Sequence, residues 1–116
     1  MSYFYRFEDL PDEQHNPDLS DAHGPTIKGE RIFFGKRFRK HGGEGAKLHH
    51  HPNEQFIYVL KGKIHYRIKD EEKIVTPGSI VHIPPNVPHS TSVYGDEDVE
   101  IIYVKDTTGT LKGIPG

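Results

Sequence analysis

Hydrophobic and polar residues alternate with a period of two along much of the chain after residue 30. In residues 63–69, Ile64, Tyr66 and Ile68 alternate with charged or polar side chains. This period places successive side chains on opposite faces of a β-strand, so it predicts a strand with one buried and one solvated face. Similar short segments, bounded by turn-forming residues, occur at 31–38, 55–60, 79–85, 89–94 and 99–105. About seven short strands separated by turns predict an all-β, antiparallel sandwich or barrel.

The segment at residues 55–60 departs from simple alternation. Ile57 and Val59 share a face with Gln55, while Phe56, Tyr58 and Leu60 make the opposite face apolar as well. A strand with two apolar faces, in a small domain with few helices, needs a cover on its outer side. Either a second subunit or the N-terminal segment of the chain itself can provide that cover. We expect a homodimer.

The chain divides into three parts by its pattern. Residues 1–30 read as an irregular arm, because residues 8–26 are polar, acidic and rich in proline, with one helical turn expected near residues 7–10. This arm is either mobile or pinned across a partner subunit. Residues 31–105 hold the strand-forming segments, and residues 106–116 form a tail with no core-forming pattern.

Composition narrows the class of protein. A length of 116 residues fits one domain, and 11 Ile and 7 Val against 5 Leu and 2 Ala favour strands over helices. The absence of cysteine excludes disulfides, thiolate nucleophiles and Cys-ligated metals. A net charge of −2 argues against nucleic-acid and membrane partners. With no apolar run of membrane-spanning length and no signal-peptide pattern, we expect a soluble, cytoplasmic protein.

Histidines concentrate in the middle of the chain, where seven of the nine lie between residues 41 and 89. On a strand, His49 and His51 project from one face and His50 from the other. Gln55 follows after a short turn, and the proline-rich corner at residues 84–88 places His89 at the start of another strand. Two imidazoles on one face of a strand are the arrangement that a metal ion needs.

These residues also follow two spaced motifs that resemble those of the cupin family. The first motif is matched by Gly43, His49, His51, Gln55 and Gly62, and the second by Gly78, Pro84, Asn86 and His89, with Asn86 where the family has glycine and Val93 where it has asparagine. The resemblance implies a small single-domain cupin. It also implies a double-stranded β-helix, or jelly-roll barrel, with a divalent metal near its centre.

The resemblance implies His49, His51, Gln55 and His89 as the metal ligands, with Gln55 in place of the usual glutamate. Glu54 is an alternative ligand if the turn is one residue shorter. Three imidazoles and an amide leave the 2+ charge of the ion uncompensated, which makes it a stronger Lewis acid and a better site for anions. Mixed nitrogen and oxygen ligands suit Fe, Mn, Ni, Zn or Cu, without identifying which of them.

Other residues are candidates for catalysis. Tyr66 and Tyr103 lie on strands with an apolar face, so they either reach the cavity as proton donors or belong to the core. His41, in the glycine-rich loop before the first motif, is a candidate for the cavity rim. We expect His65 on a solvated face and His82 in a packed or dimer-facing position. In the basic run at residues 36–40, one arginine, at position 37 or 39, is expected to project inward and bind a carboxylate.

The cupin fold hosts many activities, so function has to be argued from the site. We expect a metal-dependent enzyme that acts on a compact oxygenated substrate chelated through carbonyl, enol or carboxylate oxygens. Two chemistries compete: ring opening or isomerisation of a sugar acid, and dioxygenase cleavage. The alternative is a non-catalytic, metal-dependent module that binds a small molecule.

Overall fold

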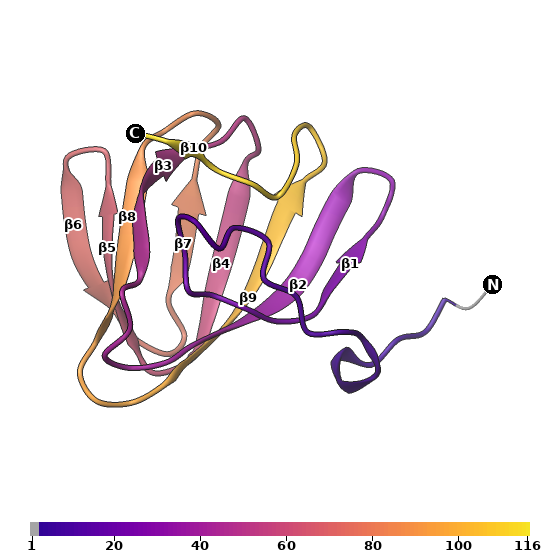
Figure 1. The fold of residues 1–116 in the computed structure, drawn as a ribbon, viewed down its shortest axis with the longest axis horizontal. Coiled ribbons are helices and arrows are strands. Elements are labelled where there is room, and N and C mark those ends of the chain that lie inside the picture. The colour runs from indigo at the N-terminus through magenta and orange to yellow at the C-terminus, as the bar shows by residue number, and fades with distance from the viewer. Residues whose placement is uncertain (1–2) are drawn as a thin grey trace.

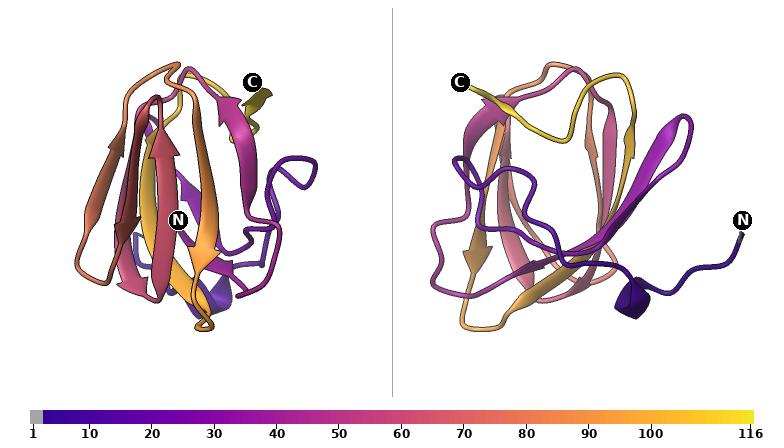
Figure 2. Two further views of the ribbon diagram at one scale, coloured as in Figure 1. Left: turned by 90° about the vertical axis from the view of Figure 1, so that its left-hand side faces the viewer. Right: turned by 45° about the vertical axis from the view of Figure 1, so that its right-hand side comes forward.

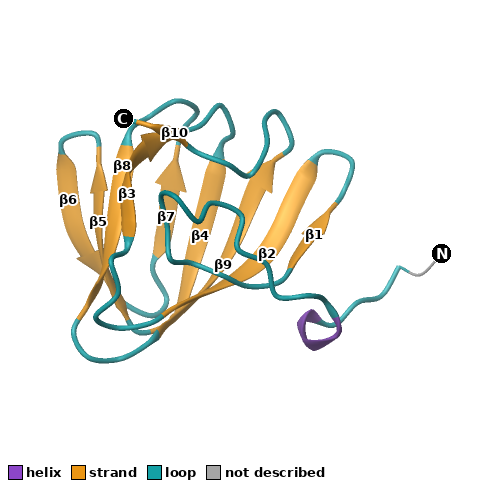
Figure 3. Cartoon of the chain, viewed as in Figure 1, coloured by secondary structure: helices purple, strands orange, loops and turns teal. Residues whose placement is uncertain are grey.

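The computed structural model describes residues 3–116, and almost all regular structure in that part of the chain is strand (Figure 3). A short 3₁₀ turn, η1, covers Phe7–Asp9, at the position where the sequence predicted a helical turn. The strands are β1 (Thr26–Lys28), β2 (Ile32–Arg39), β3 (Ala46–His50), β4 (Gln55–Lys61), β5 (Lys63–Ile68), β6 (Glu71–Val75), β7 (Ile80–Ile83), β8 (His89–Tyr94), β9 (Val99–Asp106) and β10 (Ile114–Pro115).

The strands form two five-stranded sheets that face each other (Figure 1). One sheet has the order β1-β2-β9-β4-β7 and the other β10-β3-β8-β5-β6, and every pairing is antiparallel. This arrangement confirms the predicted all-β jelly-roll barrel.

Side chains that alternate along each strand fill the space between the sheets. On β9 the inward positions are Val99, Ile101, Tyr103 and Lys105, all of them buried. On β5 the inward residues Ile64 and Tyr66 are buried as the alternation predicted. The core therefore closes one end of the barrel with aliphatic side chains, and polar side chains replace them towards the other end.

The turn between β4 and β5 depends on Gly62. Its φ of 81° lies in the left-handed region, and a Cβ atom at this position would lie 2.7 Å from the carbonyl oxygen of Asp98. Only glycine fits such a backbone so close to a neighbouring strand. This explains the glycine at the end of the first motif.

The N-terminal arm is pinned to its own barrel. Isolated bridges join Ser20 to Ala46 and His23 to Phe38, and Leu19 is buried. The end of the arm adds β1 as an edge strand to β2, a pairing that the sequence pattern did not predict. Figure 2 shows the arm running from η1 across towards β3.

The outer surface of the sheet that contains β4 is apolar. Phe34, Phe56, Tyr58 and Ile80 lie on neighbouring strands and are 44%, 46%, 45% and 70% exposed. The arm covers only one edge of this surface, where the Phe7 ring stacks on Phe34 at 5.7 Å. We call these four exposed side chains the outer apolar face.

Within residues 3–116, no helix has both the length and the apolar character needed to cross a lipid bilayer.

Candidate metal centre

Three imidazoles meet in the space between the two sheets, and we call them the histidine cluster: His49, His51 and His89. His49 on β3 is the direct pairing partner of His89 on β8, and His51 follows β3 on the same face as His49. The His49–His89, His51–His89 and His49–His51 ring centroids lie 4.2, 4.9 and 5.9 Å apart. One ring nitrogen of each residue lies within 4.8 Å of the others, and all three side chains are buried. The structure thus brings together three of the four predicted metal ligands.

Backbone carbonyls fix the orientation of each imidazole. Nδ1 lies 2.6 Å from the carbonyl oxygen of Lys47 for His49, 3.0 Å from that of Asn53 for His51 and 2.9 Å from that of Val87 for His89. A carbonyl oxygen can only accept a hydrogen bond, so each Nδ1 carries the proton and donates it. The lone pair of each ring therefore resides on Nε2, the atom left to bind a metal, and the carbonyls hold the rings in place.

The histidine cluster fits a divalent transition metal in two further respects. The buried Nε2 atom of His51 has no hydrogen-bond partner in the described chain, and a buried acceptor without a partner is costly unless something binds it. Burial lowers the pKa of His51 to about 4 and that of His89 to about 3, and it also lowers the pKa of His49. All three rings are therefore neutral near pH 7, as metal ligands must be.

Gln55 and Glu54 point to different sides of the sheet. Gln55, the first residue of β4, lines the same cavity as His49 and His89. Glu54 is exposed, and its carboxylate accepts a hydrogen bond from Nε2 of His82 at 2.8 Å on the outer surface. The placement of the two side chains favours Gln55 over Glu54 as a fourth ligand.

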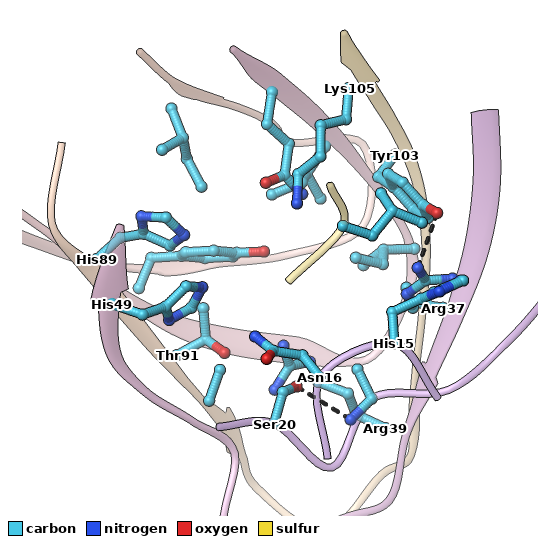
Figure 4. Close-up of a pocket in the computed structure, with 18 residues that line it drawn as sticks. His15, Asn16, Ser20, Arg37, Arg39, His49, His89, Thr91, Tyr103 and Lys105 are labelled. Atoms are coloured by element: carbon cyan, nitrogen blue, oxygen red, sulfur yellow. Dashed lines mark hydrogen bonds between the residues drawn. The ribbon is translucent and has the colours of Figure 1, made fainter. Parts of the chain in front are cut away.

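The cavity beside the histidine cluster has a volume of about 90 Å³. Figure 4 shows His49 and His89 on one side of it and Tyr103 and Arg37 on the opposite side. Ile57 and Ile83 supply apolar wall. The remaining polar side chains that line it are His15, Asn16, Ser20, Arg39, Gln55, Tyr66, Thr91 and Lys105.

The two predicted tyrosines both line this cavity, but their hydroxyl groups differ. The Tyr103 hydroxyl accepts a hydrogen bond from Arg37 at 2.7 Å and shares another with Thr26. No hydrogen bond joins the Tyr66 hydroxyl to another residue in the described part of the chain. Burial raises the pKa of Tyr66 to about 12, with the nearby Arg39 charge opposing the shift. Tyr66 therefore keeps its proton at neutral pH and can donate it.

Four other histidines, His41, His50, His65 and His82, do not line the cavity. His41 is exposed, and its Nδ1 lies 2.6 Å from the carboxylate of Asp98, so the structure does not bring this predicted rim residue to the site. His50 points away, towards the carbonyl of Gly116 at 3.0 Å. His65 lies beside Glu72 at 3.2 Å on an outer face, and His82 stacks on Phe56.

The sequence analysis missed part of the cavity wall. Lys105 faces inward and is only 7% exposed, and the alternation of Ile101, Tyr103 and Lys105 along residues 99–105 was a signal that could have found it. Both Arg37 and Arg39 project inward rather than one of them, because residues two apart on a strand share a face. His15 lies on the arm, where no periodic pattern indicated its direction.

The proline corner of the second motif connects directly to the first motif. Asn86 has a φ of 63°, a conformation that asparagine tolerates better than most residues, and it stands where the family pattern has glycine. Its backbone N–H donates to the carbonyl of His51 at 2.8 Å. The two loops that carry His51 and His89 therefore hold each other in place.

We compared the sequence and the structure with known proteins. The family model described as a cupin domain matches residues 37–105. The chain belongs to the cupin family. No curated protein sequence matches this cupin.

Several solved structures resemble this cupin. An RmlC-like cupin from Shewanella frigidimarina NCIMB 400 is 20% identical with a TM-score of 0.76, over 91% of each chain. The polyketide cyclase RemF from Streptomyces resistomycificus is 19% identical with a TM-score of 0.82, over 99% of this chain and 85% of that one. KdgF from Halomonas sp. is 14% identical with a TM-score of 0.73, over 90% of this chain and 94% of that one. At these identities the likeness concerns the fold alone.

Proposed function

We propose that this cupin is a metal-dependent enzyme that moves a proton within a compact oxygenated substrate, as an isomerase or ring-opening enzyme does. A divalent transition metal is held by the histidine cluster, with Gln55 as its fourth ligand. The observation that carries the proposal is that three neutral imidazoles cluster at a cavity that is lined by two of them, His49 and His89, and also by Tyr66, whose hydroxyl makes no hydrogen bond within residues 3–116.

The metal, when bound, supplies a Lewis acid that polarises a carbonyl, enol or carboxylate group of the substrate. The side chains of the cavity supply the rest. Tyr66 donates a hydrogen bond or proton to the substrate, since its high pKa keeps the hydroxyl protonated. His15 is a basic nitrogen outside the histidine cluster, and burial lowers its pKa so that it is neutral and able to accept a proton near pH 7. Ile57 and Ile83 restrict water on the apolar side.

One of the structural comparisons supports an enzymatic role. The similar structure RemF is named as a polyketide cyclase, so a barrel with this fold can serve as an enzyme. The ligand chemistry supports the proposal more directly, because an all-neutral ligand set leaves the positive charge of the metal available to an anionic or enolic substrate.

Hydrogen–deuterium exchange tests the proposal. Protein loaded with Zn²⁺, Mn²⁺, Ni²⁺ or Fe²⁺ is incubated in D₂O with a panel of keto acids, diketones and unsaturated uronates, and NMR follows deuterium entering carbon positions next to the carbonyl group. We expect metal-dependent exchange, and we expect Tyr66→Phe to slow it about 100-fold while metal content stays unchanged. Tyr94→Phe, which alters an exposed tyrosine, is the matched control.

Two results contradict the proposal in different ways. Oxygen uptake by the iron-loaded protein, without exchange, would assign dioxygenase chemistry to the site. Tight ligand binding at the metal with neither exchange nor oxygen uptake would assign a non-catalytic binding module.

We further propose that two copies of this cupin pair through the outer apolar face. The aromatic and aliphatic side chains of that face are contiguous, because the pairing register aligns Phe34 and Phe56 on either side of Val104. Exposed apolar surface of this kind is unusual on a monomer. The arm covers only its edge at Phe34, which leaves the remainder for a partner subunit.

A further inference from the structure

Three basic side chains line the cavity away from the histidine cluster. Arg37 and Arg39 project from β2, and Lys105 projects from the neighbouring strand β9. The Lys105 residue is 7% exposed and the Arg39 side chain 10% exposed. Figure 4 shows Arg37 and Tyr103 together on the wall that faces the histidines.

Only one of these cations has a carboxylate partner. Arg39 lies 3.4 Å from the carboxylate of Asp21. The hydrogen bonds of Arg37 go only to neutral oxygens, which are those of Gly24, Thr26, Lys36 and Tyr103. For Lys105, no hydrogen bond or salt bridge joins the amine to any residue between 3 and 116.

Lys105 lines the cavity and is only 7% exposed, so its amine, which carries three donors, is left to water or to a ligand in the cavity. Two acidic groups act on this wall from outside salt-bridge distance: Glu13, which lies 3.3 Å from His15, acts on Arg37, and Asp106 acts on Lys105. Neither carboxylate forms a salt bridge with Arg37 or Lys105, so the donors of both cations remain open to a ligand, and a metal held by neutral ligands would add positive charge to the cavity. Such a cavity is complementary to an anion with more than one charge.

Lys105 on β9 is the direct pairing partner of Gln55 on β4, and β9 also pairs with β2, the strand that carries Arg37. Burial, followed by the charge of Arg37, lowers the pKa of Lys105 to about 8. The charge of Lys105 in turn contributes, after burial, to the lowered pKa of each member of the histidine cluster. Because Arg37, Lys105, His49 and His89 line one cavity, a single ligand can contact both the basic wall and the metal position.

We propose that Arg37 and Lys105 form a carboxylate-binding subsite, and that the substrate of this cupin is a small organic dianion. One carboxylate lies against Arg37 and Lys105, and the oxygenated group at the other end lies at the histidine cluster. This assignment rests on the proposed function for the metal end of the ligand. The cavity volume of about 90 Å³ is suited to a compact ligand.

Isothermal titration calorimetry with simple probes tests the subsite. Succinate is titrated into Zn²⁺-loaded protein, and butyrate and succinamide serve as the monoanionic and uncharged analogues. We expect succinate to bind more tightly than butyrate, and succinamide not to bind. Lys105→Met should weaken succinate binding about tenfold or more, whereas Lys63→Met, which removes an exposed lysine from β5, should not.

The metal-free protein separates this inference from the proposed function. Lys105-dependent binding of butyrate to metal-free protein supports the subsite even if no catalytic activity is found. The subsite proposal is overturned if wild type and Lys105→Met bind succinate with equal affinity. It is also overturned if the wild-type protein prefers succinamide or binds none of the probes. Binding of inorganic phosphate in place of succinate overturns the carboxylate assignment. Because succinate and succinamide are compared on wild-type protein, the test holds even if a variant fails to fold.

Discussion

Adjacent residues at the start of β4 have opposite surroundings because successive side chains on a strand alternate between its faces. Gln55 faces the cavity, while Glu54 is bonded to His82 on the outer surface. A one-residue shift of this strand would exchange an amide for a carboxylate beside the histidine cluster. The charge of the ligand set therefore depends on which of these two neighbouring residues faces inward.

We predict that Gln55→Ala weakens metal binding about 10–100-fold, because it removes one ligand of four. Glu54→Ala and His50→Ala should leave the affinity unchanged, since both side chains point away from the cluster. Metal competition titrations measure the three affinities. A loss of metal in Glu54→Ala with none in Gln55→Ala would transfer the ligand role to Glu54.

Acid should destabilise the metal-free protein. His51 and His89 have pKa values of about 4 and about 3 in the folded chain, against 6.5 ordinarily. As the pH falls below 6.5, the unfolded chain takes up protons at these positions before the folded chain does, so stability decreases. Allowing for screening by solvent, we expect Tm to fall by about 5–10 °C between pH 6.5 and pH 4.5.

Calorimetry of the metal-free protein across this pH range measures the effect. The double variant His51→Gln/His89→Gln should show a flatter dependence of Tm on pH. A variant whose slope equals that of wild type would show that other groups cause the acid sensitivity.

At the scale of elements, the loop between β3 and β4 connects the site to the end of the chain. Asn53 is fully buried, its carbonyl accepts the hydrogen bond from His51, and its side-chain amide donates to the carbonyl of Asp106 at 2.7 Å. This single residue therefore orients one imidazole and attaches the loop to the end of β9.

We predict that Asn53→Ala lowers the free energy of unfolding by about 1–3 kcal/mol, because it leaves a buried carbonyl without its donor. Metal affinity should fall as well, because the loop that carries His51 loses its side-chain attachment to the end of β9, although the backbone carbonyl that orients the His51 ring remains. Asn86→Gly is the matched control, as glycine readily adopts the left-handed backbone at that position. Urea denaturation and metal titration measure both effects, and an Asn53→Ala variant as stable as wild type would contradict the argument.

The elements that the sequence predicted are those with strong local patterns. Residues 63–68 and 89–94 combine alternation with clear turn residues at both ends, so their bounds could be predicted closely. β1 and β10 have three and two residues and are strands only because they pair with β2 and β3. No local pattern can indicate such pairings.

The same distinction explains the candidate site. The spacing of His49, His51 and His89 was visible because motif positions lie at fixed distances along the chain. The direction of the arm at His15 depends on contacts with distant strands, so it could not be predicted. Lys105 was an intermediate case. The alternation along its strand indicated that it faces inward, but lysines are usually exposed, so its burial was not expected.

At the scale of the whole molecule, the proposed dimer gives a direct test of the outer apolar face. We predict that Tyr58→Lys converts a dimer into a monomer, because it places a charge in the centre of that face. Ile74→Lys, which changes an exposed residue on the other sheet, should remain dimeric. Sedimentation equilibrium measures both, and a wild-type protein that is monomeric at high concentration would contradict the pairing.

The cavity wall includes His15 from the arm, strand residues from the middle of the chain and Leu111 from the tail. A partly synthesised or partly folded chain consequently has no complete binding site, since its first and last contributors are almost one hundred residues apart. Long-range closure of this kind is slow compared with forming a local hairpin. During refolding, recovery of ligand binding should coincide with the final folding step, which makes binding a sensitive marker for the fully assembled native chain.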